Sequence, residues 1–243
     1  MAVIKYTQED ILHTLQDPHR LGSALTDIIL GGQDGLVNVL GVVLGVAAAT
    51  GDPLIVLTAG LATTFAESIS MGAVAYTSTL AQADQYESER EREHRHILQV
   101  PEVEREEIRL IFADKGYQGK ELEEVVETVT ANEDLWVAVM LAEEHRLSPT
   151  NRGEALRSAL IVGLSAFIGS LIPLVPFLFL PVISAMWLAI AVTSLVLFGA
   201  GGYKARITIG RPVRSGFEMA LIGTISALFG YLVGLLLKAP AGL

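Results

Sequence analysis

Apolar and polar positions divide this chain of 243 residues into long blocks. Five stretches are apolar over enough residues to cross about 30 Å of hydrocarbon as helices. These predicted membrane spans cover residues 28–50, 54–80, 155–180, 182–203 and 216–237. Pro173, Pro176 and Pro181 fall near the end of the third span, where they predict a kink and a turn into the fourth.

A polar segment, residues 82–153, separates the second span from the third and carries 18 of the 27 acidic residues. Apolar residues recur in it at helical spacing, which favours a small folded domain over a disordered linker. The second span is expected to continue as a stalk helix to about Gln99, where Pro101 stops it. Further helices are expected over residues 102–115, over 120–130, and from the N-cap Asn132 to a point before Pro149.

The placement of Lys and Arg predicts the orientation in the membrane. Basic residues precede the first span and lie between spans two and three and spans four and five, but both short hairpins on the opposite side lack them. Because cytoplasmic loops are enriched in Lys and Arg, the N-terminus and the acidic domain are expected in the cytoplasm.

The predicted fold is an all-α multi-pass membrane protein with five transmembrane helices. A cytoplasmic helical acidic domain is inserted between helices 2 and 3. The expected parts are a cytoplasmic N-terminal segment (1–26), transmembrane helices 1–2 (27–81), the acidic metal-binding domain (82–153) and transmembrane helices 3–5 (154–243).

Composition excludes several classes of function. The net charge is −10, and the acidic domain alone contributes −9 from 18 acidic and nine basic residues, so nucleic acid is not an expected partner. The chain has no cysteine, and we find no nucleotide-binding or nucleophile motif. We therefore expect no enzyme activity and no prosthetic group. No cleavable signal peptide or long targeting extension is apparent, which favours a prokaryotic cell membrane over a vacuolar membrane.

The acidic domain carries candidate metal ligands on three predicted helix faces. They are Glu89, Glu93 and His96 on the stalk, Glu104 and Glu107 after the Pro101 turn, and Met140 and Glu144 on the last helix. Carboxylate, imidazole and thioether groups together suit Fe(II) or Mn(II), with Zn(II) or Co(II) as alternatives. The competing interpretation is a solvated acidic surface whose glutamates pair with neighbouring arginines.

Four further candidates lie inside the first two spans. Asp34 and Asn38 are one turn apart in the first span, and Glu67 and Met71 are one turn apart in the second. An ionised carboxylate at that depth costs at least about 2.5 kcal/mol, so it normally faces a polar cavity or a partner. Alternatives are an interfacial Asp34 and a protonated Glu67 bonded to a neighbouring helix.

The chain resembles the vacuolar iron transporter family from about Arg20 onward. The similar segments include Asp27-Ile-Ile-Leu-Gly-Gly-Gln-Asp34-Gly-Leu, Glu67-Ser-Ile-Ser-Met71-Gly-Ala and Val100-Pro101-Glu-Val-Glu104-Arg-Glu-Glu107. The resemblance implies a homodimeric five-helix transporter that removes Fe(II), and often Mn(II), from the cytoplasm in exchange for protons.

The resemblance also implies roles for particular residues. Asp34 and Met71 match pore positions that handle the translocated metal. The positions that match the cytoplasmic metal-binding domain are Glu93, Glu104, Glu107, Met140 and Glu144. Two departures, His96 in place of a glutamate and Leu141 in place of a second methionine, predict fewer bound ions or a different metal preference.

Our hypothesis from the sequence is a proton-coupled exporter of Fe(II) and Mn(II), which are its substrates. Its expected partners are divalent metal ions, protons, the lipid bilayer and a second copy of the chain. The alternatives are a membrane-anchored metal sensor or buffer and a passive divalent cation channel.

Overall fold

The computed structural model describes residues 21–208 and 210–238, and every regular element in these ranges is helical. The chain forms two compact units. Unit 1 comprises the residues up to Val74 and those from Ser158 onward, and unit 2 comprises Ala75–Arg157. Most of the expected N-terminal segment, residues 1–20, lies outside the described residues.

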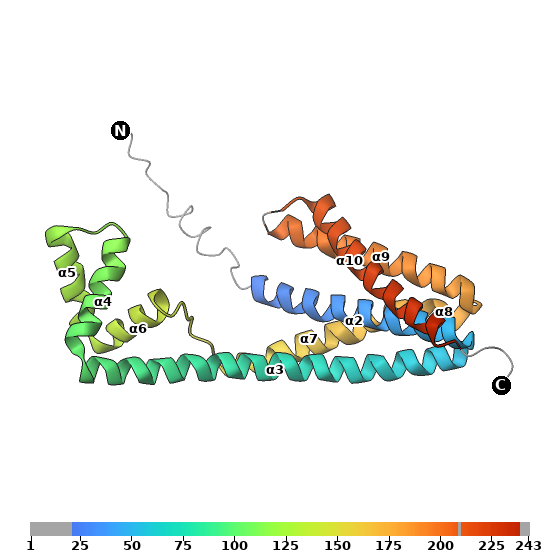
Figure 1. Cartoon of the computed structure of the whole chain (residues 1–243), viewed down its shortest axis with the longest axis horizontal. Coiled ribbons are helices and arrows are strands. Elements are labelled where there is room, and N and C mark those ends of the chain that lie inside the picture. Colours follow the sequence, from blue (N-terminus) through green and yellow to red (C-terminus); the bar gives the residue numbers. More distant parts are fainter. Residues whose placement is uncertain (1–20, 209, 239–243) are drawn as a thin grey trace, which may run out of the picture. The chain divides into compact units, whose positions relative to one another are not determined.

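The five predicted spans are confirmed as helices that are long and apolar enough to cross a membrane (Figure 1). They are α2 (Leu21–Thr50), α3 (Pro53–Gln99), α7 (Glu154–Leu171) with η1 (Ile172–Leu174) and α8 (Val175–Phe179), α9 (Val182–Ile207) and α10 (Pro212–Leu236). The kink in the third span is also confirmed, because α7 ends just before Pro173 and the chain continues as η1 and α8.

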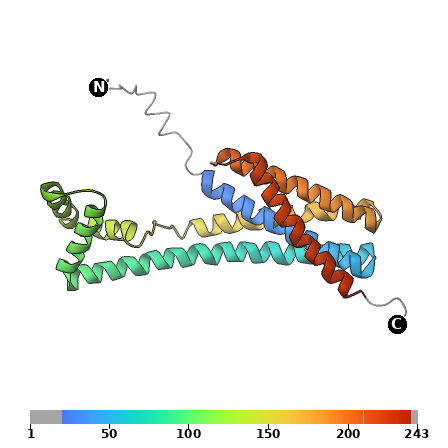
Figure 2. The ribbon, with the colours of Figure 1, turned by 45° about the horizontal axis from the view of Figure 1, so that its top comes forward.

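Glycines let α10 pack closely on α2 within one chain, and Figure 2 shows α10 crossing the bundle. Gly41 and Gly45 of α2 face Gly230 and Gly234 of α10. A Cβ on Gly45 would lie 2.7 Å from the carbonyl oxygen of Gly230, closer than real Cβ atoms approach. The small-xxx-small pattern at Gly41 therefore serves packing inside the chain.

Glycines next to Asp34 have the same role. A Cβ on Gly31 would overlap the carbonyl oxygen of Val162 in α7, and a Cβ on Gly35 would overlap that of Ala166. The backbone of α2 therefore lies directly against α7 on both sides of Asp34. This contact holds the first half of α2 in position along its length.

Unit 2 contains the second half of α3 together with α4 (Pro101–Asp114), α5 (Gly119–Thr130) and α6 (Glu133–Glu143). The predicted stalk and the three predicted helices are confirmed. The core of unit 2 consists of Ile97, Ile108, Val126, Val129, Trp136, Val137, Met140 and Leu141. The side chain of Asn132 accepts a hydrogen bond from the backbone N–H of Leu135 at 3.0 Å, as expected for the N-cap of α6.

The α2–α10 contact predicts the effect of a single methyl group. Gly234→Ala places a Cβ on the carbonyl oxygen of Gly45, so the two helices must separate. We expect a loss of about 1–3 kcal/mol of stability, as for overpacked cores. Thermal unfolding of the purified protein in detergent measures it.

Gly199→Ala in α9 is the matched control, because a Cβ there meets nothing within 4 Å. We expect no loss of stability from this change, since alanine is the better helix former. Equal unfolding temperatures for the two variants would contradict the packing role of Gly234.

Candidate metal sites

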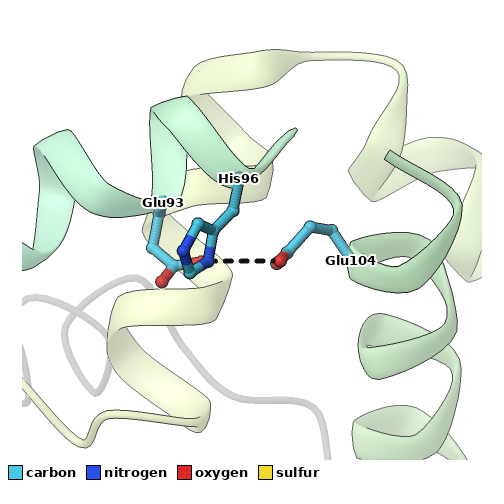
Figure 3. A group of neighbouring side chains, drawn as sticks. All are labelled: Glu93, His96 and Glu104. Carbon is cyan, nitrogen blue, oxygen red and sulfur yellow. Dashed lines mark ion pairs between the residues drawn. The ribbon is translucent and has the colours of Figure 1, made fainter. Parts of the chain in front are cut away.

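Three side chains of unit 2 meet where the stalk turns into α4. Glu93 and His96 come from the last turns of α3 and Glu104 comes from the first turn of α4, and Figure 3 shows them pointing toward one another. One ligand atom from each lies within 4.8 Å of the others. His96 Nδ1 and a carboxylate oxygen of Glu104 lie 3.4 Å apart.

Glu93 also belongs to a second group with Glu144 and His145, in which the ligand atoms again lie within 4.8 Å of one another. His145 Nε2 lies 3.0 Å from Glu93 Oε1 and 4.0 Å from Glu144 Oε2. Glu93 is therefore common to both groups of candidate ligands. We call these five residues the Glu93 cluster.

Burial makes the Glu93 cluster electrostatically unfavourable by itself. Only 2% of Glu93 and 4% of Glu104 is exposed. Burial, followed by the negative charges of Glu107 and Glu93, raises the pKa of Glu104 to about 7. Burial and the charge of Glu107 likewise raise the pKa of Glu144. The carboxylates are thus held closer together than their charges favour.

Histidine offsets part of this repulsion. Burial disfavours the positive charge of His145, but its hydrogen bond with Glu93 and the charges of Glu144 and Glu93 outweigh that effect and raise the pKa of His145. One oxygen of Glu93 and one of Glu104 are buried without a hydrogen-bond donor in the described part of the chain. Buried oxygens of this kind are suited to accept a divalent cation.

The other sequence candidates of unit 2 lie around this cluster. Glu107 is half-buried, and its charge acts on both Glu104 and Glu144. Met140 is fully buried in the core of unit 2. Glu89 forms an ion pair with Arg92 at 2.8 Å. This contact is the kind expected from the competing interpretation, in which glutamates of an acidic surface pair with neighbouring arginines.

Sequence reasoning missed His145, although it directly follows Glu144. The signal was weak, because His145 lies beyond the end of α6 and no helical spacing connects it to the stalk. His94, another histidine of the stalk, is placed differently. Its Nδ1 lies 2.7 Å from Glu133 Oε1, and it belongs to neither group of candidate ligands.

Unit 1 brings together three of the four intramembrane candidates. The Asn38 side chain donates a hydrogen bond of 2.5 Å to Glu67 Oε1, joining α2 to α3. The carboxyl group of Asp34 also interacts with Glu67. Glu67 Oε2 is buried without a donor in the residues described. Met71 is half-buried one turn further along α3.

The raised pKa of Glu104 predicts how the stability of unit 2 depends on pH. The pKa changes from 4.5 in a model peptide to about 7 in the fold, so the folded state binds more protons between these values. Stability then falls as the pH rises from about 4.5 to about 7 in metal-free buffer. Glu104→Gln should flatten this dependence.

Trp136 fluorescence in a Trp187→Phe background measures the thermal midpoint of unit 2, because Trp136 is part of its core. Glu102→Gln, an exposed change on the same helix, is the control and should keep the wild-type profile. If the Glu104→Gln and wild-type profiles run in parallel, Glu104 does not titrate as described.

Comparison with known proteins identifies the family. The model of the VIT family matches residues 25–235. Vacuolar iron transporter 1 of Oryza sativa subsp. japonica is 35% identical over 211 residues, covering 86% of this chain and 84% of that protein. Vacuolar iron transporter 1 of Arabidopsis thaliana is 34% identical over 220 residues, covering 88% of each.

A more distant similarity extends to protozoa. The vacuolar iron transporter of Plasmodium berghei (strain Anka) is 30% identical over 240 residues, covering 95% of this chain and 86% of that protein. The match of the family model, residues 25–235, covers the acidic domain and nearly all of the five spans. The chain is a multi-pass membrane protein and a transporter, not an enzyme, and it belongs to the VIT family.

Proposed function

We propose that the protein exports Fe(II) and Mn(II) from the cytoplasm in exchange for protons. The observation that carries this proposal is the contact between two apolar spans at Asn38 and Glu67, with Asp34 interacting at the same carboxyl group. Carboxylates inside membrane spans are costly, and they mark ion pathways more often than they serve as anchors. A sensor or buffer that uses its spans only as anchors does not need carboxylates inside those spans.

The groups inside the spans match the cargo. Asp34 and Glu67 provide hard oxygen ligands, Asn38 provides an amide oxygen or a donor, and Met71 provides a thioether. Oxygen ligands suit Mn(II), and a mixed set with a softer atom also accepts Fe(II). The related proteins from Oryza sativa and Arabidopsis thaliana are named for iron transport, which supports Fe(II) as a substrate.

Proton coupling follows from the chemistry of the same carboxylates. A carboxylate must be ionised to coordinate a metal well, so protonation of Asp34 or Glu67 from the far side weakens binding and releases the ion. The ion leaves as the protons enter. In this scheme the acidic domain faces the cytoplasm, and its Glu93 cluster collects the metal there.

A homodimer is part of this proposal. Asn38 is exposed on the single chain although it lies within a membrane span, and Phe65 and Ile69 on α3 are exposed as well. A polar amide facing lipid is unfavourable. A second subunit against this face would remove Asn38 from lipid and enclose the carboxylates between two copies.

Metal flux into proteoliposomes tests the transport path. Asp34→Asn and Glu67→Gln each remove a charged ligand, so we expect the initial rate of Fe(II) uptake driven by a pH gradient to fall at least about tenfold. Met71→Leu should reduce uptake of Fe(II) more than uptake of Mn(II), because it removes the softer ligand.

The control is Glu154→Gln, which removes an exposed carboxylate from the first turn of α7 and should leave the rate unchanged. A pH-sensitive dye in the lumen reports proton movement at the same time. Metal uptake that survives Asp34→Asn and ignores the pH gradient would overturn the antiporter. Uptake without counterflow of protons at a fixed ratio would indicate a channel.

A second prediction concerns the metal preference of the Glu93 cluster. Imidazole suits Fe(II) better than Mn(II), so His145→Ala should weaken binding of Fe(II) by about tenfold and binding of Mn(II) less. Anaerobic titration calorimetry of the full-length protein in an Asp34→Asn background measures both affinities without the intramembrane pathway.

His94→Ala is the matched control, because it removes an imidazole from the same unit but outside the Glu93 cluster. It should leave both affinities unchanged. Equal losses of Fe(II) affinity in the two variants would show that His145 acts on the fold of unit 2 and not as a ligand.

A further inference from the structure

A cavity of about 690 Å³ lies at one end of unit 1, between the C-terminal ends of α2 and α10 and the start of α9. Its size falls within the range of about 300–1,000 Å³ that is usual for small-molecule sites. The walls are mainly apolar and include Leu44, Ala48, Met186, Ile190, Leu228 and Leu235. None of these residues belongs to the Glu93 cluster or to the intramembrane carboxylates.

The cavity opens where the apolar spans end. Its lining runs along α2 from Thr50 back to Leu44 and along α9 from Val182 to Ile190. At 1.5 Å per residue these distances are roughly 9 and 12 Å. The cavity therefore extends over about two helical turns from the ends of these apolar spans.

Small side chains in α2 create this space. Ala47 and Ala48 line the cavity in the last turns of α2, whereas the larger Leu40 lies further in and is buried in the core of the bundle. Trp187 and Tyr231 line the same cavity, and 72% of Trp187 is exposed. Tryptophan and tyrosine are typical of the membrane interface, where the apolar ring meets the polar headgroups.

One positive charge lies at the mouth of the cavity. Lys238, in the turn after α10, belongs to the lining and is exposed, and it forms no ion pair within the residues described. The carboxylate of Asp52, next to the lining residue Gly51 in the chain, accepts the backbone N–H groups of Leu54 at 2.8 Å and Ile55 at 3.3 Å. The ammonium group is thus available to an anion.

We propose that this cavity binds a phospholipid with an anionic headgroup. One acyl chain occupies the apolar space between α2, α9 and α10, and the headgroup phosphate pairs with Lys238. The aromatic side chains of Trp187 and Tyr231 lie at the level of the glycerol backbone. The apolar walls of the cavity and the single charge in its lining fit this occupant, and its depth of roughly 9–12 Å holds the part of the acyl chain nearest the headgroup.

This assignment goes beyond metal transport and does not depend on it. Lipids that merely surround the protein would show no preference between headgroups. A positive charge at the end of a defined cavity favours an anionic headgroup. One basic side chain near the membrane surface makes binding of an anionic headgroup about fivefold tighter than binding of a zwitterionic headgroup.

Native mass spectrometry of the full-length protein tests the site. The protein is purified in detergent and supplied with equal amounts of phosphatidylglycerol and phosphatidylcholine. We expect wild type to retain phosphatidylglycerol about fivefold more than phosphatidylcholine, and Lys238→Gln to abolish that preference. Ala48→Leu and Ala48→Phe fill the cavity and should reduce retention of both lipids in proportion to side-chain size.

Lys120→Gln in unit 2 is the charge-matched control, because Lys120 is exposed and pairs with Glu124, and it should keep the wild-type ratio. Circular dichroism confirms that each variant is folded. An unchanged lipid ratio in Lys238→Gln would overturn the headgroup assignment. Unchanged retention in folded Ala48→Phe, or increased retention after removal of residues 239–243, would overturn occupation of the cavity by lipid.

Discussion

A carboxylate taken out of water needs a hydrogen-bond donor, a proton or a cation, and both units of this protein place carboxylates where donors are scarce. In unit 2 the side chains of Glu93 and Glu104 are almost fully buried, and one oxygen of each has no donor among the described residues. In unit 1 Glu67 accepts a hydrogen bond from Asn38, and its second oxygen has no donor in the part of the chain that the structure describes. Glutamates outside these two sites have different surroundings. Glu123, for example, is exposed and accepts two hydrogen bonds from Arg109, which lower its pKa.

Such an arrangement is stable only if the surrounding helices hold it together. In unit 1 the backbone of α2 lies directly against α7 on both sides of Asp34, because Gly31 and Gly35 have no side chain to keep the helices apart. Further along, Gly41 and Gly45 allow the same closeness to α10. In unit 2 the core around Ile108 and Met140 fixes α4 and α6 against the stalk. Packing energy from apolar contacts therefore offsets the repulsion among the carboxylates in each unit.

Much of this architecture could be predicted from the sequence, because span length and helical spacing are local properties. The stalk, the turn at Pro101 and the N-cap at Asn132 all follow from such signals. His145 could not be predicted, since a turn places it and not a helix. After α6 the backbone N–H of His145 still donates to the carbonyl oxygen of Met140, and Arg146 then adopts φ of 55°, in the left-handed region, where the helical path ends. A non-glycine residue in that conformation has no clear sequence signal. The cavity at Lys238 was missed for a related reason, since it depends on where three helices end relative to one another.

The two sets of candidate ligands differ in a way that the proposed transport requires. The Glu93 cluster combines three carboxylates with two imidazoles, and two of its carboxylates are almost fully buried, so a divalent ion there replaces repulsion with attraction. The set inside the spans has two carboxylates, one amide and one thioether in a single chain, and one carboxylate is partly satisfied by Asn38. An ion path must bind strongly enough to admit the ion and weakly enough to release it. Strong binding is useful where metal is collected, and it would slow transport inside the membrane. The Asn38–Glu67 hydrogen bond fits this need, because the amide group competes with the metal for the carboxylate and so lowers the barrier to release.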